Sequence, residues 1–284
     1  MRSCMLLALL AAAVAQCSRA DAQPSGGPVL ASRSAKLQPP NRGAITVAFV
    51  VTDGATVIDF AGPWEVFADV MIPDRGAGED EQMPFRLYTV SDSREPIRGS
   101  GGLRIVPDYT FDDAPPPRVV VIGAQAGKSA KMIAWMRRMT ETADVVMSVC
   151  TGAFKLALTG ALDGKPATTH HDYYDAFHQT FPHVRLQRGK RFVRSSERIF
   201  TAGGLTSGMD LALHVVDLYF GRAVAEQTAS YMEYEGTGWK RADRQGFGAT
   251  RKPRAANSET RDSVAADGSS VSGGRTVRHT ASPE

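Results

Sequence analysis

Short runs of β-branched and other apolar residues alternate with amphipathic stretches between residues 45 and 236. Runs that are apolar at almost every position are typical of strands buried on both faces of a parallel sheet. We expect such strands at residues 45–51, 85–91, 118–124 and 144–150, and two further short strands split by a turn within residues 191–204.

The amphipathic stretches predict helices that cover this sheet. In the first, Gly62 and Pro63 come at the start, and proline is favoured in the first turn of a helix. In the last, Ser207 is followed three residues later by Asp210, the spacing of a capping box. The alternation predicts an α/β fold whose functional sites gather at the carboxyl ends of the strands. The expected helices are 62–71, 127–143, 152–160 and 207–221.

Residues 1–22 have the features of a secretory signal peptide: a basic second residue, an apolar run over residues 5–15, and an Ala-Asp-Ala pattern before Gln23. We therefore expect an exported protein, periplasmic or secreted. A lipoprotein signal around Cys17 is disfavoured, because Gln16 stands where such signals need a small residue. The run is too short to span a bilayer, so no stable membrane insertion is expected.

Composition predicts where the globular part begins and ends. Residues 23–42 are rich in Pro, Gly and Ser, which indicates a flexible linker, and residues 240–284 lack large apolar residues, which indicates a disordered tail. Residues 43–239 would form one domain. The net charge of +3 belongs to the ends, since each terminal segment carries four more basic than acidic residues and the core is left at −5. An acidic core argues against nucleic-acid binding.

Cys150 lies where strand 144–150 passes into helix 152–160. Removal of the signal would take away Cys4 and Cys17, so the exported protein would keep one thiol and no internal disulfide. A side chain at such a strand-turn-helix elbow faces the helix N-terminus, which favours a thiolate and lowers the pKa of the cysteine. The alternative is a small buried side chain without chemistry.

A nucleophile needs a group that manages protons and donors that hold negative charge. Asp59 follows the first strand and precedes a helix, although a turn-forming or capping aspartate would have the same pattern. The backbone amides of Gly123 and Ala124, directly after the run 118–122, are candidate donors that could face the thiol. Thr151 offers a hydroxyl and an amide directly beside Cys150.

The histidines suggest a metal site only weakly. His171, Asp175 and His178 would share one helical face, but no further ligand is visible and a polar helix surface explains them as well. His214 is surrounded by apolar residues and is expected in the core. No Cys-x-x-Cys pair or phosphate-binding loop is found, so we expect neither a metal nor a cofactor.

Three segments together resemble the DJ-1/PfpI superfamily, which has a flavodoxin-like three-layer sandwich related to class I glutamine amidotransferases. They carry the blocks D-x-x-G-P-x-E-V-F, from Asp59, and C-T-G-A-F, from Cys150. The resemblance extends over nearly the whole core and is strongest to the isonitrile hydratase branch, which is shared by the ligand-sensing half of AraC-type regulators. The segments are residues 57–70, 148–184 and 198–239.

The resemblance implies a cysteine-dependent hydro-lyase that acts on a small electrophilic substrate and converts an isonitrile into an N-substituted formamide. Cys150 would attack the terminal carbon, Asp59 would act as acid and base, and Thr151 would support the site. A homodimer is expected by analogy with relatives of this fold.

Two departures from the wider superfamily matter. Peptidase-like members have a histidine directly after the cysteine, where this chain has Thr151, so hydration is favoured over peptide cleavage; His170 is a possible substitute partner. Residues 240–284 cannot form the helix-turn-helix pair of a regulator. The alternatives are a non-catalytic sensor and a stress protein with a reversibly oxidised thiol, with glyoxalase-like or peptidase-like activity less favoured.

Overall fold

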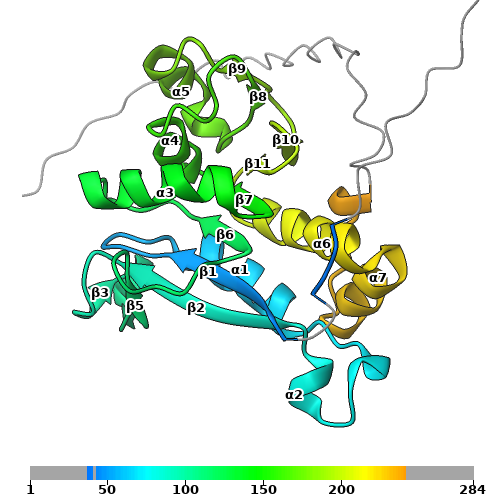
Figure 1. Ribbon diagram of the computed structural model, residues 1–284. Coiled ribbons are helices and arrows are strands. Elements are labelled where there is room, and N and C mark those ends of the chain that lie inside the picture. The colour runs from blue at the N-terminus through cyan, green and yellow to red at the C-terminus, as the bar shows by residue number, and fades with distance from the viewer. Residues whose placement is uncertain (1–36, 41–42, 241–284) are drawn as a thin grey trace, which may run out of the picture. The chain divides into compact units, whose positions relative to one another are not determined.

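The computed structural model describes residues 37–40 and 43–240 (Figure 1). Their centre is a seven-stranded sheet with the order β10-β11-β7-β6-β1-β2-β5, in which every pair is parallel except β10 and β11. The strands are β1 (Ile45–Val50), β2 (Phe85–Ser91), β5 (Tyr109–Thr110), β6 (Val119–Ile122), β7 (Val145–Ser148), β10 (Phe192–Arg194) and β11 (Ile199–Ala202). The mostly parallel α/β sheet predicted from the alternating pattern is confirmed.

Helices cover both faces, which gives three layers. Val47 and Phe49 of β1 pack in the cluster with α1, α6 and α7, whereas Ala48 and Val50 pack in the cluster with α3, α4 and α5. Since successive side chains of a strand point to opposite faces, a strand buried on both sides must be apolar throughout. The helices are α1 (Val57–Ala68), α3 (Ala130–Thr142), α4 (Gly152–Ala157), α5 (Tyr174–Thr180), α6 (Ser207–Phe220) and α7 (Arg222–Tyr231).

Smaller elements lie in the connections. Strands β3 and β4 form an antiparallel pair, and β8 and β9 a short parallel pair. Within the described residues, no helix combines the length and apolar character needed to cross a membrane. These elements are η1 (Pro73–Arg75), α2 (Glu79–Gln82), β3 (Ile97–Arg98), η2 (Ser100–Gly102), β4 (Arg104–Ile105), β8 (Pro166–Ala167), η3 (His171–Tyr173) and β9 (Arg185–Leu186).

Helix α1 begins earlier than its sequence predicted. It starts at Val57, so Pro63 lies inside the helix and not in its first turn. The proline removes only one backbone hydrogen bond, the one that residue 63 would donate to the Asp59 carbonyl, and the helix continues past it. As a consequence, Asp59 belongs to the first turn of α1 and not to the loop before it.

The predicted capping box at the start of α6 is also wrong. Thr206 is the N-cap residue and its side chain makes no capping hydrogen bond. Asp210 turns instead to the guanidinium of Arg191, with 2.6 Å between its Oδ2 and Nε. A hydrogen bond to a cation is stronger than one to a neutral amide, and the Ser207 amide already donates to the Gly204 carbonyl at 3.1 Å.

The ends of the domain differ partly from the prediction. The amide of Leu37 donates to the carbonyl of Leu218 at 2.9 Å, so residues 37–40, expected in a flexible linker, pack on the domain. Trp239, at the other end, is fully buried. The predicted signal peptide, residues 23–36 of the linker and the tail beyond residue 240 lie outside the described residues.

Candidate active site

Cys150 occupies a tight turn between β7 and α4. Its φ of 58° lies in the left-handed region, which is uncommon for a residue other than glycine and is found at functional sites. Two contacts hold the turn: the Cys150 amide donates to the Gly203 carbonyl at 2.8 Å, and Thr169 Oγ1 donates to the Cys150 carbonyl at 2.9 Å. The cysteine is therefore at the predicted elbow, with its residue 6% exposed.

Gly152 allows the helix after the elbow to approach the sheet. A Cβ at this position would lie 2.0 Å from the Ile122 carbonyl oxygen at the end of β6, a distance that no side chain can have. The glycine of the C-T-G-A-F block is thus required for close packing of α4 on β6.

Asp59 is buried beside this elbow with little to compensate its charge. Its Oδ2 accepts a hydrogen bond from the Ala124 amide at 3.0 Å, and the residue is 0% exposed. Its Oδ1 has no hydrogen bond of ordinary geometry within the described part of the chain. Burial raises the pKa of Asp59 from 3.8 to about 6, although the Ala124 amide, the Cys150 thiol and the Leu205 amide oppose that rise.

The thiol of Cys150 is not the stabilised thiolate that its sequence position predicted. Burial and the neighbouring charge of Asp59 raise the pKa of Cys150 to about 12, and the amides of Thr151 and Leu205 offset only part of this. The helix that follows has six residues, so its dipole is small, and its effect is weaker than that of burial and a carboxylate in contact.

Asp59 and Cys150 form a pair in which one proton can pass from the thiol to the carboxylate without changing the net charge. Each lies close enough to affect the pKa of the other. When the thiol proton moves to Asp59, the negative charge that opposes ionisation of Cys150 disappears, so a thiolate beside a neutral carboxylic acid replaces a thiol beside a carboxylate. The arrangement suits a nucleophile that is activated by an adjacent base at the moment of attack.

The other predicted donors are placed differently. The Ala124 amide is bonded to Asp59, so the expectation that it faces the thiol as a free donor is wrong. Gly123 lies next to the same carboxylate, since a Cβ there would be 3.0 Å from the Cβ of Asp59. Thr151 is the N-cap residue of α4 and acts on Cys150 through its amide, while its hydroxyl makes no capping bond.

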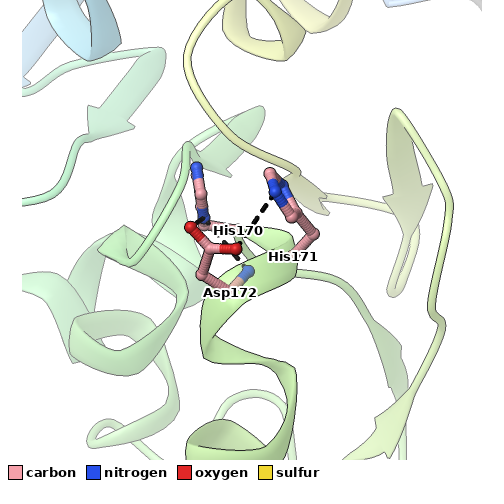
Figure 2. A group of neighbouring side chains, drawn as sticks. All are labelled: His170, His171 and Asp172. Carbon is pink, nitrogen blue, oxygen red and sulfur yellow. Dashed lines mark hydrogen bonds and ion pairs between the residues drawn. The ribbon is translucent and has the colours of Figure 1, made fainter. Parts of the chain in front are cut away.

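His170 lies close to the elbow through its backbone neighbours. It follows Thr169, which bonds to Cys150, and its ring packs against Gly204, where a Cβ would be 2.2 Å from the ring carbon Cδ2. Figure 2 shows His170 together with His171 and Asp172 at the start of η3. The structure thus places His170 beside Gly204 and next to the segment that holds the Cys150 backbone.

The shared helical face of His171, Asp175 and His178, which suggested a metal site only weakly, does not form. His171 belongs to η3 and the other two to α5, and Asp175 pairs with Arg188. His214 is buried, with its ring stacked on Phe192 at 5.1 Å, which agrees with the predicted core position.

Sequence reasoning missed the loop that closes the site from the other side. Leu205, after the pair Gly203 and Gly204, has a φ of 53°, and its amide interacts with both Cys150 and Asp59. The double glycine directly after a strand was the available signal, because such pairs mark a close approach of the backbone. The sequence pattern gave no indication that this loop contacts Cys150 and Asp59.

The fold is a flavodoxin-like sandwich, and its strand-turn-helix elbow has a buried cysteine beside a buried carboxylate. These features define a class of α/β proteins in which the elbow cysteine is the candidate nucleophile. The chain belongs to the DJ-1/PfpI family, whose model matches residues 45–218.

Two similar proteins support this membership. The isonitrile hydratase of Pseudomonas putida is 30% identical over 196 residues, which are 67% of this chain and 79% of that protein. A solved THiJ/PfpI family protein from Pseudomonas syringae has a TM-score of 0.57 and 28% identity, over 77% of this chain and 84% of that chain.

Transcriptional regulators are also similar. The HTH-type transcriptional regulator GbdR of Pseudomonas aeruginosa is 26% identical over 203 residues, which are 70% of this chain and 53% of the regulator. The chain therefore spans about half the length of that relative, and family membership alone does not distinguish an enzyme from a ligand-sensing domain.

Proposed function

We propose that this protein is a cysteine-dependent hydratase that converts isonitriles into N-substituted formamides. The buried pair of Cys150 and Asp59 carries the proposal, because it provides a nucleophile and a base in contact at the carboxyl end of the sheet. Similarity to the isonitrile hydratase supports the choice of substrate.

In the first step, Asp59 takes the proton of the Cys150 thiol while the sulfur bonds to the terminal carbon of the isonitrile. That carbon then takes the proton back from Asp59. The S–H group has been added across the carbon, and the intermediate is a thioimidate, R–N=CH–S–Cys. The raised pKa of Asp59, about 6, leaves it a carboxylate at neutral pH and able to accept the proton.

In the second step, Asp59 removes a proton from a water molecule whose oxygen adds to the thioimidate carbon, and passes that proton to the nitrogen, which gives R–NH–CH(OH)–S–Cys. Asp59 then takes the hydroxyl proton as the carbonyl forms and the carbon–sulfur bond breaks, and gives this proton to the departing sulfur. The product is R–NH–CHO, so one water has been consumed and both residues return to their starting states. The amides of Thr151 and Leu205 support the sulfur while it carries negative charge.

A second candidate, a ligand sensor without turnover, is favoured by one observation. The Cys150 residue is 6% exposed, and its pKa of about 12 keeps it a thiol unless Asp59 takes the proton. A thiol in this state can line a binding site without reacting, as a ligand-sensing domain requires.

The test is incubation of the purified protein with a panel of small isonitriles, measuring loss of the isonitrile infrared band and appearance of the formyl proton by NMR. The hydratase proposal expects turnover that Cys150→Ala and Asp59→Asn both abolish, while Asp113→Asn, at an exposed carboxylate, leaves it unchanged. Turnover that survives in Cys150→Ala would contradict the mechanism. Saturable binding of an isonitrile without turnover would favour the sensor.

Export and homodimer formation also remain proposals. Amino-terminal sequencing of the protein recovered from cell fractions tests cleavage before Gln23, and light scattering of the mature protein tests the dimer. A chain that keeps residues 1–22 in the cytoplasmic fraction would contradict export.

A further inference from the structure

Three consecutive side chains with metal-binding atoms converge at the start of η3, beside the elbow (Figure 2). The ligand atoms of His170, His171 and Asp172 all lie within 4.8 Å of one another. Asp172 is the centre of the group: its Oδ1 is 3.1 Å from His171 Nε2, and its Oδ2 is 3.8 Å from His170 Nδ1. Among residues 37–40 and 43–240, this is the one group of three such side chains.

The hydrogen bonding of His170 shows that the nitrogen facing the group acts as an acceptor. Its Nδ1 accepts a bond from the Asp172 amide, at a length of 3.3 Å. An accepting nitrogen carries no proton, and this is the state in which imidazole binds a metal. The bond is long, so a metal ion can replace it at little cost.

One ring has to turn before both histidines can bind the same ion. The two rings are stacked, with centroids 4.4 Å apart and planes 24° apart, so their in-plane lone pairs do not meet at one point. The side chain of His170 is 15% exposed and rests against Gly204, whereas that of His171 is 73% exposed. His171 is therefore the ring that is free to turn toward Asp172 and His170.

We propose that His170 Nδ1, His171 Nε2 and the Asp172 carboxylate form a binding site for a divalent late transition-metal ion, with Zn²⁺ as its representative. Two imidazoles and one carboxylate suit such ions, whereas Mg²⁺ and Ca²⁺ prefer ligand sets made of oxygen. Water would complete the coordination. The hydratase proposal requires no metal, so this site goes beyond it and stands or fails separately.

The site would lie directly beside the elbow. Thr169, one residue before His170, donates to the Cys150 carbonyl, and Gly204 follows the residue that accepts the Cys150 amide. An ion held by these three residues would therefore fix the start of η3 next to the two segments that hold the backbone of Cys150. Ion binding to the folded state should raise the thermal stability of the protein.

The test is calorimetric titration of tag-free protein with Zn²⁺ and, separately, with Mg²⁺. Wild type and Cys150→Ala are both titrated, because the thiol is itself a possible zinc ligand. We expect one saturable Zn²⁺ site per chain in both proteins and no Mg²⁺ binding.

Matched variants assign the ligands. His171→Ala and Asp172→Asn should each weaken Zn²⁺ binding by about tenfold or more, whereas His178→Ala, at an exposed histidine of α5, should leave it unchanged. Absorption bands of bound Co²⁺ should appear in wild type and disappear in His171→Ala, which is exposed and expected to fold. No saturable binding, loss of binding in Cys150→Ala alone, or binding that depends on His178 would each overturn the proposal.

Discussion

Two buried aspartates, Asp59 and Asp210, occupy similar positions and have opposite surroundings. Each lies in the first turn of a helix packed on the same face of the sheet, and their exposures are 0% and 1%. Asp210 accepts from Arg191 Nε at 2.6 Å, from the Tyr234 hydroxyl at 3.2 Å and from the Trp239 amide at 3.3 Å. Asp59 accepts one hydrogen bond of ordinary geometry, from the Ala124 amide, and has only the weaker contacts of the Cys150 thiol and the Leu205 amide besides; it meets no cation among the described residues.

The difference separates a structural carboxylate from a reactive one. A buried charge that meets a cation and further donors is compensated, and Asp210 uses its contacts to tie the end of the domain to the hairpin of β10 and β11. The same hairpin supports the elbow, because the Arg191 carbonyl accepts the Gly203 amide. An uncompensated buried charge destabilises the fold and leaves a group able to exchange a proton.

The largest effects are expected from Asp59→Asn, which should lower turnover and raise stability. Under the proposed mechanism, turnover should fall by about 10²- to 10⁴-fold, the usual contribution of a general base. Stability should rise at pH 7.5, because the native pKa of about 6 exceeds the unfolded value of 3.8, and this shift costs the charged state up to about 3 kcal/mol. Urea unfolding and isonitrile turnover measure the two effects. A variant that loses both activity and stability would contradict the contrast.

Asp210→Asn should have the opposite effect on stability. It leaves Arg191 without its charged partner, and we expect a loss of about 2 to 3 kcal/mol, below the range for fully buried pairs because the Arg191 side chain is 42% exposed. Tyr234→Phe removes one hydrogen bond to the same carboxylate and should cost about 1 kcal/mol. Thermal and urea unfolding check both values. Equal stability of Asp210→Asn and wild type would contradict the structural role assigned to Asp210.

The pH dependence should also differ between wild type and Asp59→Asn. For a carboxyl whose native pKa is raised, the destabilising effect is fully present above about pH 6 and is lost as the pH falls toward 3.8. The stability difference between the two proteins should therefore be largest near pH 7.5 and almost vanish near pH 4. In wild type, turnover should fall about tenfold per pH unit below about pH 6, as Asp59 loses its ability to accept a proton. A constant stability difference over this range would argue against the raised pKa.

The strands and the elbow of this site can be predicted from the sequence, but the surroundings of its side chains cannot. The all-apolar runs of β1, β2, β6 and β7 can be recognised because strands covered on both faces must be apolar throughout. Cys150 can be placed at an elbow because the strand ends and Gly152 begins the helix. Its raised pKa cannot be predicted in this way, since it depends on burial and on Asp59, which the fold brings from another segment.

The two aspartates were ambiguous for a related reason. Pro63 has the pattern of a helix start, and so Asp59 seemed to lie in a loop; Ser207 and Asp210 have the spacing of a capping box, although the structure pairs Asp210 with Arg191. Local spacing suggests local partners. The partners that decide the roles of both carboxylates come from distant segments, namely Ala124 for Asp59 and Arg191 for Asp210.

The smallest effects should separate two threonines that flank the elbow. Thr151→Val should change turnover by no more than about threefold and stability by less than about 0.5 kcal/mol, because the Thr151 hydroxyl makes no capping bond and its amide remains. Thr169→Val keeps the shape but removes the shorter bond to the Cys150 carbonyl and leaves only the 3.4 Å bond from the Ala153 amide, which should cost about 1 kcal/mol. Urea unfolding and turnover of both variants test this. If Thr151→Val had the larger effect on turnover, the Thr151 hydroxyl and not its amide would support the sulfur. The backbone amides at the elbow would then not be the groups that stabilise the sulfur beside Asp59.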